Sequence, residues 1–253
     1  MISDEAVARL QHVVAARYAI VREIGRGGMG VVYEAEDREL VRRVAMKVVD
    51  QKNAEAELTA TLEHPGIVPV HDAGTLPDGR AFYIMKLIKG VTLAECGDRL
   101  QPVPLFLRIC EPVAFAHSRG IVHCDLKPSN LRIGEFGEVL VMDWGIANRH
   151  GGTAGYIAPE QKLGDITPAA DVFALGTILR HLAGSSAPRR LRKIIAKATA
   201  ARKEDRYPTA RELAADVRAF LDSREAAARN RALIAIIAAY LAMRVIVLLL
   251  THH

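Results

Sequence analysis

The stretch His123–Asn130 restricts the fold more than any other, because it places three chemically active side chains within one short segment. These are Asp125, Lys127 and Asn130, and Asp143 follows them after an apolar segment that is predicted to form a short hairpin. The spacing suits a site in which one carboxylate orients a hydroxyl nucleophile, while a carboxylate and an amide hold Mg²⁺. The sequence therefore predicts a site built from this loop and the end of the hairpin.

The order of the predicted elements indicates an α+β fold class. Residues 18–88 contain β-branched runs separated by glycine or polar turns, with one helical pattern over residues 54–63. Later segments are mostly helical, and their ranges are 104–119, 168–183, 189–202 and 209–221. Strands first and helices later predict a small β-rich N-lobe (18–88) and a mainly helical C-lobe (89–222). A short amphipathic helix is also expected within residues 1–17.

Three glycines, Gly25, Gly27 and Gly30, precede Val32 in a pattern that also opens dinucleotide-binding folds. In those folds a helix follows the glycines, whereas a strand pattern follows Gly30 in this chain. That difference favours a glycine-rich flap between two strands, whose backbone N–H groups can approach phosphates because no Cβ intervenes. A plain glycine turn is the alternative that these residues alone leave open.

Taken in order, these motifs and the lysine of Val44-Ala45-Met46-Lys47 resemble those of the eukaryotic-type Ser/Thr protein kinases. Among these kinases the chain is most similar to the membrane-anchored bacterial group, and the resemblance covers roughly residues 17–222. It implies a two-lobed protein-kinase-like fold, ATP and Mg²⁺ as cofactors, and a protein substrate with Ser or Thr hydroxyls. Two residues depart from the family pattern, since Cys124 stands where arginine is common and Trp144 where phenylalanine is common.

The resemblance implies a role for each active side chain. Asp125 would orient the substrate hydroxyl or accept its proton, and Lys127 would neutralise charge on the γ-phosphate. Asn130 and Asp143 would be the metal ligands. Lys47 would hold the α- and β-phosphates, although a lysine in an apolar strand is usually a charge at the solvated edge of a sheet.

Lys47 is expected to pair with a glutamate on the next helix. Glu55 fits best by its distance ahead of the segment His64–Val68, which this family often shows. Glu57 is the competitor, because both carboxylates cannot face the site from one helix.

The adenine pocket is expected between the glycine flap and the hinge segment 85–88. Met85 would guard the back of this pocket, and the hinge backbone would hydrogen-bond the adenine edge. Arg132 stands where the family usually offers an apolar residue beneath the base, so its guanidinium either stacks on the adenine or weakens ATP binding. The expected nucleotide-binding residues are Gly25, Gly27, Gly30, Val32, Ala45, Lys47, Met85, Leu87 and Arg132.

Other positions match structural parts of the family. Thr153 would hydrogen-bond Asp125. Glu160 and Arg206 would form a buried ion pair, and Asp171 would brace the backbone of the catalytic loop.

Activity is expected not to depend on phosphorylation of the activation segment. In many kinases the arginine before the catalytic aspartate pairs with a phosphate there, and Cys124 offers no positive charge. Between Gly145 and Ala158 the hydroxyl side chains are Thr153 and Tyr156, and both match positions with structural roles. The alternative for the whole chain is a pseudokinase that serves as a nucleotide-binding or scaffolding module at the membrane.

The end of the sequence differs from the rest. Residues 232–250 form an apolar run interrupted only by Arg244, and about nineteen helical residues reach about 28 Å, close to the thickness of a bilayer core. The basic segment 223–231 precedes this run, so the positive-inside bias predicts a single-pass cell-membrane protein with its kinase domain in the cytoplasm. A helix docked on the soluble domain or on a partner is the alternative. The net charge of +5 is modest, and a nucleic-acid partner is not expected.

Overall fold

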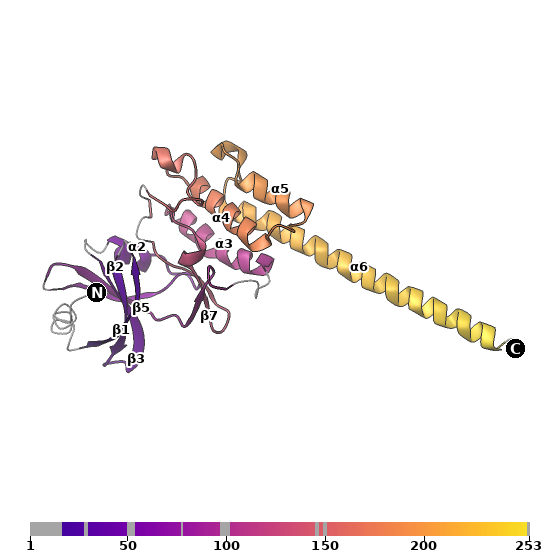
Figure 1. Ribbon diagram of the computed structural model, residues 1–253, viewed down its shortest axis with the longest axis horizontal. Helices are drawn as coiled ribbons and strands as arrows, with labels where there is room; N and C mark the ends of the chain where they lie inside the picture. The colour runs from indigo at the N-terminus through magenta and orange to yellow at the C-terminus, as the bar shows by residue number, and fades with distance from the viewer. Residues whose placement is uncertain are drawn as a thin grey trace.

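The computed structural model describes residues 17–27, 30–49, 54–76, 78–96, 102–144, 147–148 and 151–251. The helix expected within residues 1–17 lies outside these ranges, apart from Arg17. A β-rich lobe and a helical lobe lie side by side, and one long helix projects from the helical lobe (Figure 1). The predicted combination of a β-sheet N-lobe and a helical C-lobe is therefore confirmed.

The N-lobe is a five-stranded antiparallel sheet with the order β1-β2-β3-β5-β4. Helix α2 lies against this sheet and follows β3 in the chain. This helix is shorter than the range 54–63 that the sequence pattern predicted. The bounds are β1 (Tyr18–Gly27), β2 (Gly30–Asp37), β3 (Arg42–Val49), α2 (Ala54–Ala60), β4 (Val70–Thr75) and β5 (Ala81–Lys86).

The side chains of strand β3 alternate between the outer face of the sheet and the face toward the other lobe. Successive side chains of a strand point to opposite faces. Val44, Met46 and Val48 are buried in the outer cluster of the sheet, with Tyr33 and Ile84 among their neighbours. The alternate residues of the strand therefore face the other lobe.

On that inner face Ala45 is buried with Ala56 of α2 and Met85 of β5. The same alternation directs Lys47 toward the space between the lobes.

The glycine motif forms the turn between β1 and β2, where Gly27 lies opposite Gly30. Gly30 has a φ of +129°, and a Cβ there would lie 2.1 Å from the carbonyl oxygen of Val48. A larger residue would therefore clash with β3 as well as strain the backbone. The prediction that a strand, and not a helix, follows Gly30 is confirmed.

The C-lobe packs four helices beside a small sheet with the order β6-β7-β8. One hydrophobic core joins these elements, and Phe106, Leu126, Trp144 and Leu175 are among its buried members. The bounds are β6 (Gly90–Thr92), α3 (Pro102–Ser118), β7 (Leu131–Gly134), β8 (Val139–Val141), α4 (Pro168–Ala183), α5 (Arg189–Ala198) and α6 (Ala210–Thr251). Among the described residues of this lobe, the 3₁₀ helices are η2 (Pro128–Asn130), η3 (Gln161–Leu163) and η4 (Lys203–Asp205).

Helix α6 differs from the prediction in its length. The helix expected over 209–221 continues without a break through the basic segment 223–231 and ends at Thr251. The expected apolar span, 232–250, therefore falls within α6, but the side chains beyond Ile237 lie outside the described residues. Among the residues whose placement is described, no helix has the combined length and apolar character needed to cross a membrane.

Candidate active site

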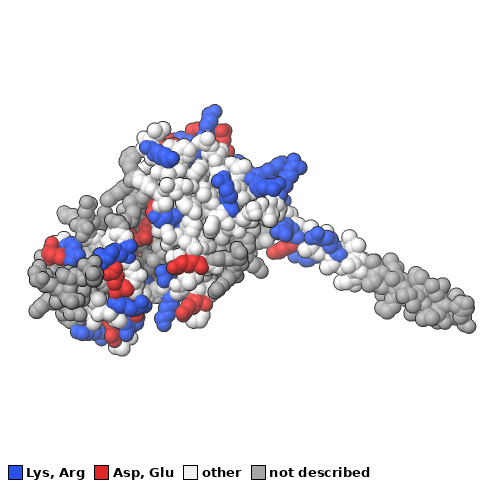
Figure 2. Space-filling view, viewed as in Figure 1, with Lys and Arg blue, Asp and Glu red and all other residues white. Residues whose placement is uncertain are grey.

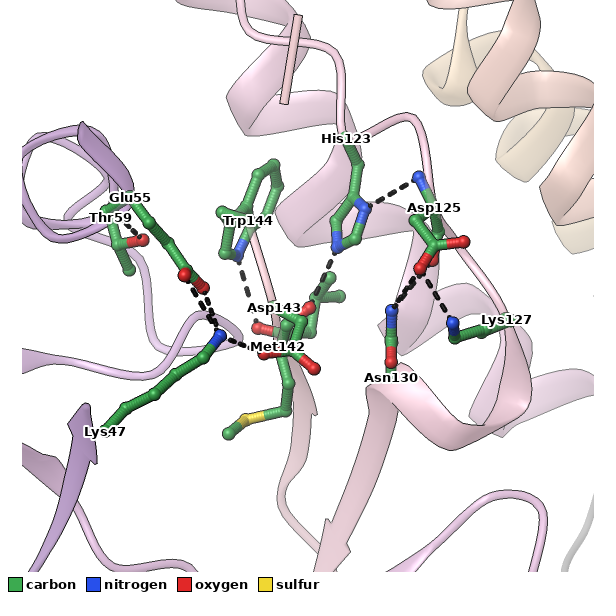
Figure 3. Close-up of polar contacts among 11 residues, drawn as sticks. Lys47, Glu55, Thr59, His123, Asp125, Lys127, Asn130, Met142, Asp143 and Trp144 are labelled. Carbon is green, nitrogen blue, oxygen red and sulfur yellow. Dashed lines mark hydrogen bonds and ion pairs between the residues drawn. The ribbon is translucent and has the colours of Figure 1, made fainter. Parts of the chain in front are cut away.

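The loop before η2 gathers the predicted catalytic side chains around one carboxylate. Oδ2 of Asp125 accepts hydrogen bonds from Nζ of Lys127 at 2.7 Å and from Nδ2 of Asn130 at 3.3 Å (Figure 3). Its other oxygen, Oδ1, accepts from the hydroxyl of Thr153 at 2.6 Å. Nζ of Lys127 also donates to the Thr153 oxygen at 2.8 Å, which closes a compact ring of contacts. The expected hydrogen bond between Thr153 and Asp125 is therefore present.

Asp171 of α4 holds the backbone of this loop, as the family resemblance implied. Its two oxygens accept hydrogen bonds from the backbone N–H of His123 at 2.8 Å and of Cys124 at 3.0 Å. Oδ2 also lies 2.8 Å from Nε2 of His117 on α3. Burial alone would raise the pKa of Asp171, but the hydrogen bond with His117 and the interactions with His123 outweigh it and hold this pKa below its usual value. The carboxylate therefore stays ionised and accepts all three bonds.

Lys47 contacts two carboxylates from opposite lobes. Its Nζ lies 2.8 Å from Oε1 of Glu55 and 2.7 Å from Oδ1 of Asp143 (Figure 3). The predicted pairing with Glu55 is therefore present, and the competitor Glu57 is exposed. Burial alone would lower the pKa of Lys47, but Asp143 and Glu55 together outweigh it and raise that pKa. The ammonium stays charged although only 4% of its side chain is exposed.

Asp143 and Asn130 leave oxygen atoms available for a cation. Asp143 lies between Lys47 on one side and Asn130 on the other in Figure 3, and its side chain is 44% exposed. In the described part of the chain, Oδ2 of Asp143 and Oδ1 of Asn130 take part in no hydrogen bond. A carboxylate and an amide oxygen fit Mg²⁺, which usually keeps several waters and takes further oxygens from phosphates.

A cavity lies beside these groups, between the two lobes. Its apolar walls suit a flat aromatic base, and Asp143 is one of the lining residues. Leu87 of the hinge contributes to the wall, and its backbone N–H makes no backbone hydrogen bond within the described ranges. An adenine edge fits such an unpaired donor. The apolar lining consists of Ile24, Val32, Ala45, Met85, Leu87, Ile88 and Met142.

Arg132 forms part of the same cavity. Its Nη2 donates to the carbonyl oxygen of Gly90 at 3.1 Å, and Arg132 lies opposite Thr92 in the β6–β7 pair. Its Nε is buried and has no hydrogen-bond partner among the described residues. The guanidinium is therefore held at the cavity with one donor unsatisfied.

The predicted nucleotide-binding glycines are only partly in contact with the cavity. Gly25 and Val32 line it, whereas Gly27 and Gly30 form the turn beyond it. Residues 28–29 lie outside the described ranges.

The end of the activation segment is held by Glu160 and Gln161 as well as by Thr153. Glu160 forms a two-pronged ion pair with Arg206, with N–O distances of 2.6 and 2.8 Å, so this predicted pair is present. Gln161 donates from Nε2 to the carbonyl oxygens of Cys124 and Gly151, both at 2.6 Å. Sequence reasoning missed Gln161, because nothing in its neighbourhood signals a contact with a loop so distant in sequence.

Trp144 takes a structural position in place of the usual phenylalanine. It is 2% exposed, and its ring lies 4.6 Å from the ring of His123, measured between centroids. Nε2 of His123 lies 2.9 Å from the carbonyl oxygen of Met142. The indole therefore joins the catalytic loop to the C-lobe core.

The protein kinase domain family matches residues 18–231 of the sequence. The chain belongs to the protein kinase family. Among curated relatives, the serine/threonine-protein kinase PknD of Chlamydia muridarum is 34% identical over 238 residues, covering 70% of this chain and 26% of PknD. The serine/threonine-protein kinase PknA of Mycobacterium tuberculosis is 38% identical over 204 residues, covering 65% of this chain and 46% of PknA. This kinase chain thus spans less than half the length of these relatives.

Proposed function

We propose that this chain is a Ser/Thr protein kinase that transfers the γ-phosphoryl group of ATP to protein hydroxyls. The observation that carries the proposal is the ring of contacts among Asp125, Lys127 and Thr153, close to Asn130. Each carboxylate oxygen has two lone pairs, so Oδ1 of Asp125 can accept from a substrate hydroxyl beside Thr153. The names of the relatives support the same activity.

The residues divide the work of the reaction between them. Bound ATP would supply the phosphoryl group, and Mg²⁺ held by Asn130 and Asp143 would neutralise charge on the phosphates. Asp125 orients the substrate hydroxyl and receives its proton. Lys127 adds positive charge on the side of the γ-phosphate, and Lys47 holds the inner phosphates. Positioning and charge complementarity supply most of the rate in such reactions.

The test is transfer of radiolabelled γ-phosphate from ATP to a generic protein substrate, with and without chelation of Mg²⁺. We expect Mg²⁺-dependent label on serine or threonine. A chain that binds ATP and transfers no label would contradict the proposal and support the pseudokinase alternative.

We also propose that activity does not require phosphorylation of the activation segment. The hydroxyl of Thr153 is already engaged by Asp125 and Lys127, and Gln161 ties the segment to the loop carbonyl of Cys124. We expect the initial transfer rate of freshly prepared protein to be unchanged after phosphatase treatment, with phosphosites mapped by mass spectrometry. A large loss of rate that tracks a site within residues 146–157 would show that a phosphate orders the segment.

Arg132 offers a prediction about nucleotide affinity. Arg132 is partly buried and lines the cavity, so its guanidinium can stack on the base. Arg132→Met removes this contact, and we expect ATP affinity to fall by about 1 kcal/mol, or about fivefold. Titration calorimetry measures this change. Arg132→Lys is the matched control, because it keeps the charge but not the planar group. Equal affinities for wild type and Arg132→Met would mean that Arg132 does not contact the nucleotide.

We further propose that residues 232–250 anchor the kinase in the cell membrane, with the catalytic lobes in the cytoplasm. The support is the apolar sequence of this run and the basic residues that precede it. The continuity of α6 into this run agrees with the proposal.

The anchor predicts how the chain responds to extraction. Alkaline carbonate and high salt should leave the full-length chain in the membrane fraction, because a spanning helix is held by hydrophobic contact. Deletion of residues 232–253 should move the protein to the soluble fraction. Full-length chain that washes off in carbonate would favour the docked-helix alternative.

A further inference from the structure

Helix α5 is basic on its exposed side and carries no acidic residue. Its apolar residues Leu191, Ile194, Ile195 and Ala198 are buried in the C-lobe core. Five exposed basic residues occupy the opposite side. We call them the α5 basic face, and they are Arg189, Arg190, Arg192, Lys193 and Lys197.

No member of the α5 basic face forms an ion pair with any residue in the described ranges. Arg190 donates to the hydroxyl of Ser223 at 3.0 Å, and Lys197 lies 4.1 Å from the centroid of the Tyr207 ring. By contrast, the exposed Arg22 and Arg43 on the N-lobe both pair with Glu34. The α5 basic face therefore keeps a positive charge that the described residues do not neutralise.

The α5 basic face lies where α6 leaves the body of the protein. The bond from Arg190 to Ser223 joins the start of α5 to α6. Figure 2 shows Lys and Arg gathered over this end of α5, close to the projecting helix. Along α6 the exposed Arg224, Arg229 and Arg231 follow Ser223, and outnumber the acidic residues of this stretch.

The distance from the Arg190 end of this face to the apolar run is short, because Arg190 contacts Ser223. Ala232 follows Ser223 by nine positions, which is about 14 Å of helix at about 1.5 Å per residue. The headgroup layer occupies about 5–8 Å beyond the bilayer core. The remaining gap is about 6–9 Å, which is within about one Debye length at physiological salt.

We propose that the α5 basic face docks on the anionic phospholipid headgroups of the membrane in which α6 is anchored. The proposal rests on the proposed anchor. Cytoplasmic leaflets carry a negative surface potential that attracts basic residues within this range. Because α6 and α5 are packed together, the lipid surface is always within reach of the face, whereas an acidic protein must first be captured. Docking would fix the orientation of the C-lobe on the bilayer.

The experiment uses the full-length chain in nanodiscs of phosphatidylcholine, with or without phosphatidylserine. Ala196→Cys places an exposed thiol on α5 between the basic residues, and the native Cys96, Cys110 and Cys124 are buried. A fluorophore on this thiol is quenched by nitroxide carried on lipid headgroups. We expect stronger quenching with phosphatidylserine, and loss of that difference at 1 M salt, where the Debye length is about 3 Å.

Two triple variants, each of which removes three positive charges, test whether the quenching depends on the α5 basic face or only on the overall charge of the protein. Arg189→Gln/Arg192→Gln/Lys193→Gln should abolish the phosphatidylserine-dependent quenching. The control Arg22→Gln/Arg43→Gln/Arg80→Gln changes the exterior of the N-lobe and should retain it. All three residues of the first variant are exposed, so the fold should not depend on them.

The possible failures are distinguishable. If the chain inserts into the neutral discs but its fluorophore is quenched equally with and without phosphatidylserine, the docking proposal is wrong and the anchor proposal still holds. Chain that joins neither disc would refute the anchor, and docking with it. Protection of the probe by an acidic polypeptide, without any phosphatidylserine effect, would assign the face to an acidic protein instead.

Discussion

Asp125→Asn is expected to lower the rate of phosphate transfer by about 10²–10⁴-fold, the usual contribution of a positioned general base. The amide is nearly the same size as the carboxylate, so the packing of the loop should survive. One of the two oxygens that Lys127 and Thr153 contact is lost, and the remaining group cannot take up a proton. Turnover is measured with saturating ATP and a protein substrate, and ATP affinity is measured by titration calorimetry.

ATP affinity should remain near that of the wild type, because Asp125 acts on the nucleophile and is not among the residues that line the nucleotide cavity. Asp78→Asn is a matched control in an exposed turn of the N-lobe, where Arg80 holds the pKa of Asp78 below its usual value. It makes the same chemical change far from the loop and should leave turnover unchanged. An Asp125→Asn protein as fast as the wild type would refute the catalytic role.

Glu160→Ala is expected to lower the free energy of unfolding by about 3–5 kcal/mol, the usual cost of leaving a buried charge without its partner. The side chain of Arg206 is 0% exposed and donates to both oxygens of Glu160. Its other bonds go to the carbonyl oxygens of Ala169, Ala200 and Ala201, which carry no compensating charge. Without Glu160 the buried guanidinium would therefore keep only neutral acceptors in the described structure.

Urea unfolding of both proteins measures this effect, provided that the slope with denaturant is the same. Asp165→Ala is the matched control, because Asp165 pairs with Lys203 on the exposed side of the same region. Exposed pairs contribute little to stability, so this control should unfold close to the wild type. Equal and small losses for the two variants would show that Glu160 is not needed to neutralise Arg206.

Much of the candidate site follows from local sequence rules. The alternation of β3 fixes the face on which Lys47 lies, and the loop spacing places Asp125 beside Lys127 and Asn130. These features need only a few neighbouring residues. The bridge from Lys47 to Asp143 is different, because it depends on how the two lobes meet, and no local pattern encodes that.

The contact of Gln161 and the length of α6 were not predicted from the sequence, and each has a physical reason. Gln161 reaches Cys124 across a gap of 37 positions, and only tertiary packing brings them together. The length of α6 was underestimated, although the stretch from Ala210 to Thr251 contains no glycine or proline. The composition changes from polar to apolar near Ala232, and this change predicts a boundary between two segments. The environment of the helix differs on the two sides of Ala232, but its backbone continues unbroken.

The helix that leaves the C-lobe is also one of the helices that build its core. Leu213, Val217 and Phe220 of α6 are buried, and the same helix continues unbroken past Ala232. A flexible linker would absorb torque, whereas a continuous helix transmits it. Rotation or tension at the distal end would therefore act on the packing of α6 against α3, α4 and α5. Such a load would be carried by the C-lobe core and not by a linker.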